Sequence, residues 1–153
     1  LKSMTRHTVW KEVASIPFSF PTHHCQGMVK LGEDYWVSSV EVIPEFVGDR
    51  SHGKGYLFQV SATGQLLNSL ELGEGPLYHP SGIDFDGTHL WIALAAYKPN
   101  SQSIIYQVDP SQMTVNPQAT SMALGAPFFL RSKIENNEEN SSERILCDSP
   151  LRS

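Results

Sequence analysis

The chain has 153 residues, a formal net charge of −5 and a hydrophobic fraction of 40%. The negative balance disfavours nucleic acid and anionic membranes as partners, because both repel an acidic surface. We also expect no transmembrane segment, since no apolar run approaches the ~20 residues that a spanning helix needs.

Nine strands are predicted in chain order, the first of them over residues 8–18. Two groups of four follow, at 27–31, 35–42, 55–61 and 66–72, and then at 82–85, 89–96, 103–109 and 113–115. Short alternating runs separated by Gly, Pro, Asp and Ser favour strands. Asp86-Gly87 indicates a hairpin turn inside the second group, because glycine accepts the positive φ that such a turn requires.

The two groups are copies of one another. Four matched pairs lie 55 positions apart: His24/His79, Gly27/Gly82, Gly32/Gly87 and Trp36/Trp91. Further on, Tyr56–Val60 matches Ile104–Val108 at an offset of 48, so the first copy carries about seven extra residues. They lie in 44–52, which we expect to be a solvated loop. A repeat of roughly 50 residues made of short strands is the signature of a β-propeller blade.

We therefore predict an all-β fold that forms part of a β-propeller. Residues 1–120 would contain two four-stranded blades, at about 24–72 and 79–116, and 8–18 would be one strand of a preceding blade. A closed ring needs four to eight blades, so this piece suggests a truncated product. Two apolar blade faces would stay uncovered, and we expect a partner chain to be needed there.

Residues 121–153 are predicted to be a tail outside the propeller and largely disordered. The run from Lys133 to Arg144 is almost entirely polar and cannot bury enough apolar surface to offset its ordering entropy. Asn140-Ser141-Ser142 matches the N-glycosylation sequon, whose use would require the secretory path. The sequence leaves the compartment open, with a preference for a secreted or extracytoplasmic location.

The run Tyr78–Gly87, followed by His89–Ala93, resembles the six-bladed propeller superfamily that includes NHL-repeat and gluconolactonase-like proteins. More narrowly, the chain resembles an uncharacterised family of propeller-like proteins. The resemblance covers residues 8–118 and implies a chain about twice this length. Superfamily members include hydrolases, receptor ectodomains and scaffold proteins, so the resemblance implies a fold and leaves the function open.

His24 and His79 are candidate site residues, because each stands at the entry to the innermost strand of a blade, near the mouth of a central channel. Imidazoles there could bind a metal or act as bases. The alternative is that each side chain bonds a neighbouring loop and locks the turn, which repetition in every blade favours. His23 has no counterpart in the second copy, and strand alternation points it away from His24.

The lactonase-like relatives that the resemblance implies hold a divalent cation with Glu, Asn and Asp side chains. Oxygen ligands of this kind suit Ca²⁺. The candidates here are Glu41 and Asp84. Their positions do not correspond in the two repeats, and two carboxylates fall short of the six or more oxygens required. We therefore expect no cofactor, with Ca²⁺ as the alternative.

Trp36 and Trp91 are expected to pack between adjacent blades, where an aromatic side chain buries a large area. The chain lacks a Gly-x-Ser-x-Gly motif, a phosphate loop and a His-Glu-x-x-His motif. We therefore predict a non-catalytic binding or interaction module whose ligand is an unknown protein or small molecule. The alternative is a fragment of a metal-dependent lactonase- or esterase-like hydrolase.

Overall fold

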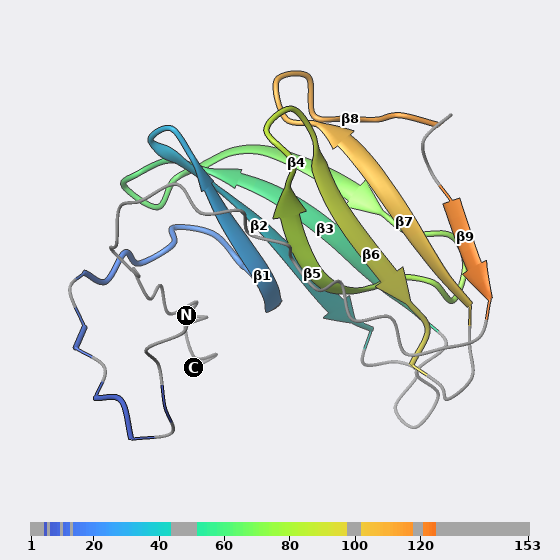
Figure 1. Ribbon diagram of the computed structural model, residues 1–153, viewed down its shortest axis with the longest axis horizontal. Coiled ribbons are helices and arrows are strands. Elements are labelled where there is room, and N and C mark those ends of the chain that lie inside the picture. Colours follow the sequence, from blue (N-terminus) through green and yellow to red (C-terminus); the bar gives the residue numbers. More distant parts are fainter. Residues whose placement is uncertain are drawn as a thin grey trace.

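Two antiparallel β-sheets lie face to face in the computed structural model (Figure 1). The structure describes residues 5, 7–9, 11–12, 14–43, 52–97, 102–117 and 121–124, the last four by their backbone alone. These residues form nine strands and no helix. Accordingly, this part of the chain offers no helix with the length and hydropathy needed to cross a membrane.

The first sheet is a simple meander in which each strand pairs with the next. Its strands are β1 (His24–Leu31), β2 (Asp34–Val42), β3 (Gly53–Val60) and β4 (Leu66–Leu72). The β1–β2 turn has Gly32 at φ 63, a backbone conformation that glycine adopts at little cost.

The second sheet repeats this meander with a divided outer edge. Its strands are β5 (His79–Phe85), β6 (Leu90–Ala95), β7 (Gln102–Asp109), β8 (Thr114–Val115) and β9 (Ser121–Leu124). The short strand β8 pairs with the end of β7, and β9 pairs with its beginning. Together they take the place that β4 has in the first sheet. Strand β9 lies beyond residue 120, where the sequence predicted the propeller part to end.

The predicted all-β class and the four-strand repeat are confirmed, and most strand ends fall within three residues of the prediction. The pairing register repeats as well. Trp36 lies opposite Val29 and Gln59, and Trp91 lies opposite the equivalent residues of its own sheet. The first strand of each sheet also has a register shift at the same repeat position. The shift is near Gln26 in β1 and near Ser81 in β5. The two sheets are thus partial propeller-like blades.

Residues 8–18 differ from the prediction, because none of the described residues in this range is in a strand. We name residues 14–22 the N-terminal strap. The strap packs Ile16, Phe18 and Phe20 against the outward side of the first sheet, and the Ser19 amide donates to the Gly64 carbonyl (3.0 Å). Its apolar side chains are partly buried against the face of a sheet and not beside an edge strand, so no ladder forms.

The main core lies between the sheets, and strand alternation gives each sheet two faces. We name the side of the first sheet that packs on the second sheet its forward face, and the side that the strap covers its rear face. The same names are used for the equivalent sides of the second sheet, which therefore packs on the first sheet with its rear face. The cluster joins Trp36, Leu57, Leu72, Leu77, Leu90, Ile92, Leu94, Ile104, Tyr106, Val108 and Met113. Trp36 thus packs between the sheets as predicted.

Trp91 does not belong to this cluster, contrary to the expectation. It lies on the forward face of the second sheet, opposite Asp84, and no third sheet covers that face among the described residues. Its indole N–H instead donates to the Asp86 carboxylate (2.7 Å). The loop predicted at 44–52, apart from His52, and the tail that follows residue 124, including Asn140, lie outside the described residues.

Replacing Gly27 with Ala should destabilise the fold. A Cβ built on Gly27 would lie 3.0 Å from the Ile83 amide nitrogen and 3.1 Å from the Gly82 Cα, so the sheets would have to move apart. Overpacking of this kind costs about 1–3 kcal/mol, measurable by urea denaturation in dilute solution.

Gly82→Ala is the matched control, because a Cβ on Gly82 meets no described atom within 4 Å. Equal losses in the two variants would contradict the close approach of the sheets at Gly27.

Candidate functional site

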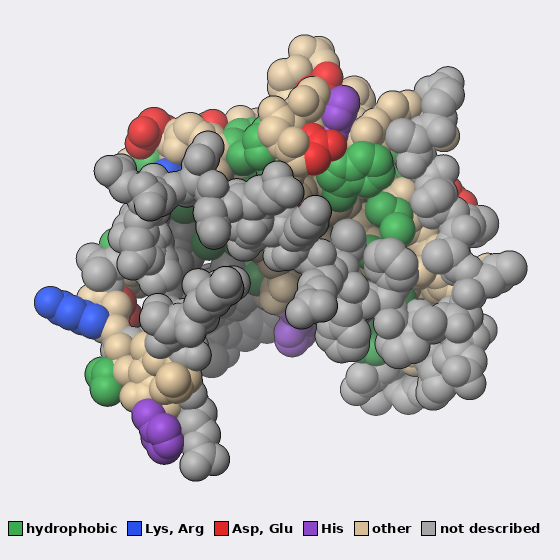
Figure 2. All heavy atoms as spheres, in the orientation of Figure 1, with side chains coloured by type: hydrophobic (Ala, Val, Ile, Leu, Met, Phe, Trp, Pro, Cys, Tyr) green, Lys and Arg blue, Asp and Glu red, His purple; other side chains and the backbone are tan. Residues whose placement is uncertain are grey.

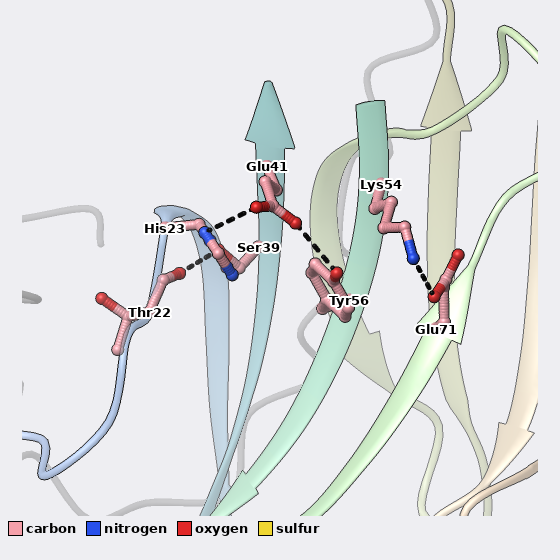
Figure 3. Close-up of polar contacts among 7 residues, drawn as sticks. All are labelled: Thr22, His23, Ser39, Glu41, Lys54, Tyr56 and Glu71. Carbon is pink, nitrogen blue, oxygen red and sulfur yellow. Dashed lines mark hydrogen bonds and ion pairs between the residues drawn. The ribbon is translucent and has the colours of Figure 1, made fainter. Parts of the chain in front are cut away.

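A group of polar side chains gathers on the rear face of the first sheet, at the end where β1 begins and β2 ends. His23 immediately precedes β1, Glu41 is near the end of β2, and Tyr56 is on β3 (Figure 3). Figure 3 shows the three side chains pointing toward one another. We name these three residues the rear-face site.

His23 has an unusual backbone. Its φ is 54°, in the left-handed region that non-glycine residues seldom adopt. The imidazole stacks on the Tyr56 ring, with centroids 5.4 Å apart and planes 14° apart. Its Nδ1 lies 3.9 Å from Oε1 of Glu41. Residues held in sparsely populated conformations persist only where their surroundings fix them, and they cluster at functional sites.

Ser39 helps to fix that conformation. Its hydroxyl donates to the carbonyl oxygen of Thr22, the residue before His23, and both Ser39 and Thr22 are buried. The bond ties the strap to β2 where the chain turns into β1. We assign Ser39 a positioning role, since its hydroxyl is committed to the backbone.

Tyr56 holds the carboxylate of Glu41. Its hydroxyl donates to Oε2 of Glu41 (3.0 Å). Burial raises the pKa of Tyr56 to about 12, and the hydrogen bond to Glu41 and the charges of Glu41 and Glu71 add to the effect. Tyr56 is therefore a neutral hydrogen-bond donor at physiological pH.

A surface ion pair continues the polar row along the sheet. Lys54 lies opposite Glu41 in the register, and its Nζ is 3.0 Å from Oε2 of Glu71 on β4. The row therefore reaches from the start of β1 to β4. Both partners are substantially exposed, so the pair contributes little to stability.

His24 and His79 are the first residues of β1 and β5, so the structure places both at the predicted strand entries. Burial lowers the pKa of His79, and the charge of nearby His24 lowers it further. The His79 ring also meets Tyr97 edge-on, with centroids 4.3 Å apart. His23 contacts Tyr56 on the rear face of the first sheet. A ligand at the histidine pair stays a prediction.

The structure does not bring Glu41 and Asp84 together. Glu41 is on the rear face of the first sheet. Asp84 is on the forward face of the second, because its neighbours Ile83 and Phe85 pack into the core. Both sheets therefore lie between the carboxylates. Within the described ranges, no group of three or more His, Cys, Asp or Glu residues could hold a metal ion. A calcium site at either carboxylate would need ligands from elsewhere.

The opposite end of the molecule, where the β1–β2 and β5–β6 hairpin turns lie, carries acidic side chains. Figure 2 shows acidic side chains along the upper rim, over the β1–β2 and β5–β6 hairpin turns of Figure 1. Those turns contain Glu33 and Asp86, and the Asp86 carboxylate also accepts the Thr88 and His89 amides (2.8 and 2.7 Å). These hydrogen bonds lower the pKa of Asp86 and order the hairpin. This end is therefore stabilised by local turn contacts.

Residues 1–122 match a protein family described as a family of unknown function, DUF6454. The chain belongs to this family. The DUF6454 match spans both sheets and ends within β9, so it covers the rear-face site and the His24–His79 pair. No curated protein and no solved structure matches the chain.

Sequence reasoning nominated His24, His79, Glu41 and Asp84 but missed Tyr56 and Ser39. One signal for Tyr56 was available, since it begins the alternating run of the first copy and has an aliphatic residue, Ile104, as its counterpart. Ser39 gave none, because its role depends on the strap crossing the sheet.

Tyr56 should ionise at a pH near 12, and Glu41→Gln should lower that value. The pKa of Tyr56 in the folded state is about 12, above the ordinary 10.0, so its neutral form contributes stability below pH 10 that is lost as the pH rises toward 12. Phenolate absorbance during an alkaline titration measures this, with Tyr56→Phe to assign the signal. An unchanged midpoint in Glu41→Gln would contradict the hydrogen bond.

His79→Gln should reduce the loss of stability in mild acid. Because burial lowers the pKa of His79, the unfolded chain takes up this proton more readily than the folded one, and stability falls as the pH drops below about 6.5. Thermal melts between neutral and acidic pH measure the slope. His7→Gln serves as control, since it removes an exposed histidine away from the sheets. Equal slopes in all three proteins would contradict the assignment.

Proposed function

We propose that the chain is a non-catalytic binding module whose rear-face site accepts a basic group on its ligand. The ligand would be a small molecule or protein that presents an ammonium or guanidinium. One observation carries the proposal: the left-handed backbone of His23 holds its ring on Tyr56 while both side chains face Glu41.

The charge around the site supports a cationic ligand. Glu41 and Glu71 outnumber Lys54 along the row, and the side chains of the two glutamates are 36% and 57% exposed. A carboxylate has about four acceptor positions, of which Tyr56 uses one on Glu41. Charge-assisted hydrogen bonds to a guanidinium or ammonium are stronger than neutral ones. The net charge of −5 would also steer a basic ligand to the molecule.

The same contacts argue against Tyr56 as a base and against Ser39 as a nucleophile at this site. The pKa of Tyr56, raised to about 12, keeps its hydroxyl protonated, so it would be a poor base. The Ser39 hydroxyl is buried and bonded to a backbone carbonyl, which removes the nearest nucleophile candidate. The alternative of a metal-dependent lactonase would require Glu41 and Asp84 to share an ion across two sheets.

We also propose that the two sheets correspond to adjacent blades of a larger propeller, with six blades as the resemblance implies. The repeated register of Trp36 and Trp91 and the shared irregularity near Gln26 and Ser81 support this view. The rear-face site would then lie between the first sheet and the blade before it.

Agmatine, which carries a guanidinium and an ammonium, is a direct probe of this proposal. In an NMR titration of ¹⁵N-labelled protein, the shifted amides should lie around His23, Glu41 and Tyr56. Glu41→Gln should weaken binding about tenfold, as expected for the loss of one charge-assisted hydrogen bond.

Glu33→Gln is the matched control, because Glu33 is an exposed glutamate in the β1–β2 turn, at the other end of the sheet. It should leave agmatine binding unchanged. Equal weakening in both variants, shifts confined to another surface, or no binding to wild type would overturn the proposal.

A further inference from the structure

We propose that docking of the N-terminal strap and binding of a basic ligand at the rear-face site stabilise one another, so that release of the strap also releases the ligand. This coupling rests on the proposed binding of a basic group at Glu41. The strap ends at Thr22, and the next residue is His23. The site therefore includes a side chain whose position depends on where the strap lies.

A backbone connection joins the strap to the site. Ser39 on β2 donates its hydroxyl to the Thr22 carbonyl oxygen, and both residues are buried. The next residue, His23, has a φ of 54°, a conformation that persists only where the surroundings fix it. If the strap leaves the sheet, His23 loses this constraint and the buried Ser39 hydroxyl loses its acceptor. Undocking therefore removes the imidazole from its place beside Glu41.

A series of aromatic contacts makes a second connection between the strap and the site. Phe18 stacks on Phe20 with ring centroids 5.6 Å apart, and Phe20 meets Phe58 of β3 edge-on at 5.2 Å. Phe58 in turn stacks on Tyr56, and Tyr56 on His23, both with centroids 5.4 Å apart. Such pairs stabilise beyond the area that they bury. The rings thus run from the strap across β3 and back to the residue that follows the strap.

The strap is held loosely enough to open. Residues 14–22 form no strand, so they lack the ladder hydrogen bonds that hold β1 to β4 together. Ser19 bonds to the β3–β4 turn instead: its amide donates to the Gly64 carbonyl (3.0 Å), and its hydroxyl contacts the same oxygen and Oε1 of Gln65 (3.3 and 3.1 Å). The apolar side chains of the strap are only partly buried. Segments of this kind open locally at low free-energy cost.

The docked and undocked strap are two states that a ligand can bias. With the strap docked, the Glu41 carboxylate is held by Tyr56 and bordered by the imidazole of His23. With the strap undocked, the imidazole is gone and water reaches the carboxylate more freely, which weakens its attraction for a basic group. A ligand that binds the docked state more tightly favours docking by the same factor, because such coupling is reciprocal.

Hydrogen exchange of the Ser19 amide measures strap docking, because this amide donates to the Gly64 carbonyl when the strap is docked. In the ¹⁵N-labelled full chain, agmatine at ten times its Kd should slow this exchange about tenfold, since a ligand that binds only the docked state lowers the population of the open one. The Asp86 amide, which donates to the His89 carbonyl in the β5–β6 turn, is the control. It should exchange at the same rate with and without agmatine.

Gly64→Ala should dislodge the strap, since a Cβ there would clash with the Pro17 carbonyl oxygen. It should speed exchange of the Ser19 amide and weaken agmatine binding about tenfold, within the usual range of coupling between sites. Gly32→Ala is the matched control. Gly32 is also a turn glycine of the first sheet with positive φ (63°, against 81° for Gly64), but a Cβ there meets no described atom within 4 Å. If Gly64→Ala fails to fold, Phe20→Ala loosens the strap through the aromatic contacts and should have the same effects.

A readout without ligand tests whether the strap orders the site. Burial raises the pKa of Tyr56 to about 12, and His23 covers part of its ring. In Gly64→Ala and Phe20→Ala the phenol should therefore ionise at lower pH than in wild type, whereas Gly32→Ala should titrate as wild type does. An unchanged Tyr56 midpoint in both strap variants would overturn the coupling.

The outcomes separate this coupling from the proposed function. Agmatine binding around Glu41 with no change in Ser19 exchange would overturn the coupling and leave the binding site standing. So would equal agmatine affinity in wild type and both strap variants, or equal weakening in Gly32→Ala. No binding of agmatine to wild type would overturn both proposals.

Discussion

The structure depends on how closely the two sheets approach one another. β3 comes so near the segment that leads into β5 that a Cβ on Gly53 would lie 2.2 Å from the Tyr78 ring, and Gly27 and Gly55 impose the same demand nearby. Because these positions carry no side chain, the strands of the first sheet can lie against the chain that leads into β5. That approach brings the starts of β1 and β5 together and sets His24 beside His79. Strand alternation directs the other residues of the first sheet outward, where Glu41 and Tyr56 meet His23.

Repetition made most of the fold predictable. The offsets of 55 and 48 are enough to align eight strands, because hairpin turns and alternating apolar residues recur with the repeat. The prediction differed at 8–18, and the reason is physical: alternation reports which side chains are buried, not which backbone groups are paired. Phe18 and Phe20 are partly buried against a sheet face without any ladder. Strand β9 was missed because it follows an interruption after β8, so it no longer lies at the offset that matches β7 to β3, although it pairs with β7 as the end of β4 pairs with β3.

For a related reason, only part of the candidate site could be predicted from the sequence. His23 stood out because it has no counterpart in the second copy, and Glu41 was nominated because of its charge. Their meeting with Tyr56 depends on cross-strand register, which an offset between repeats does not supply. The Ser39 bond to Thr22 depends on the path of the strap, which differs from the predicted strand. Asp84 failed to join Glu41 because strand alternation sends the two carboxylates to opposite sides of the double layer.

The two matched tryptophans differ in one respect with a practical consequence. The indole nitrogen of Trp36 is buried without a hydrogen-bond partner in the part of the chain that the structure describes, whereas that of Trp91 donates to Asp86 at the margin of its sheet. The repeat explains the difference. In the first copy, Leu31 is the residue that corresponds to Asp86, and it has no carboxylate to accept a hydrogen bond from Trp36. An indole in a dry, apolar setting emits at shorter wavelength than one bonded to a wet carboxylate. Trp36 and Trp91 are therefore two built-in optical reporters, one for the seam between the sheets and one for the margin of the second sheet.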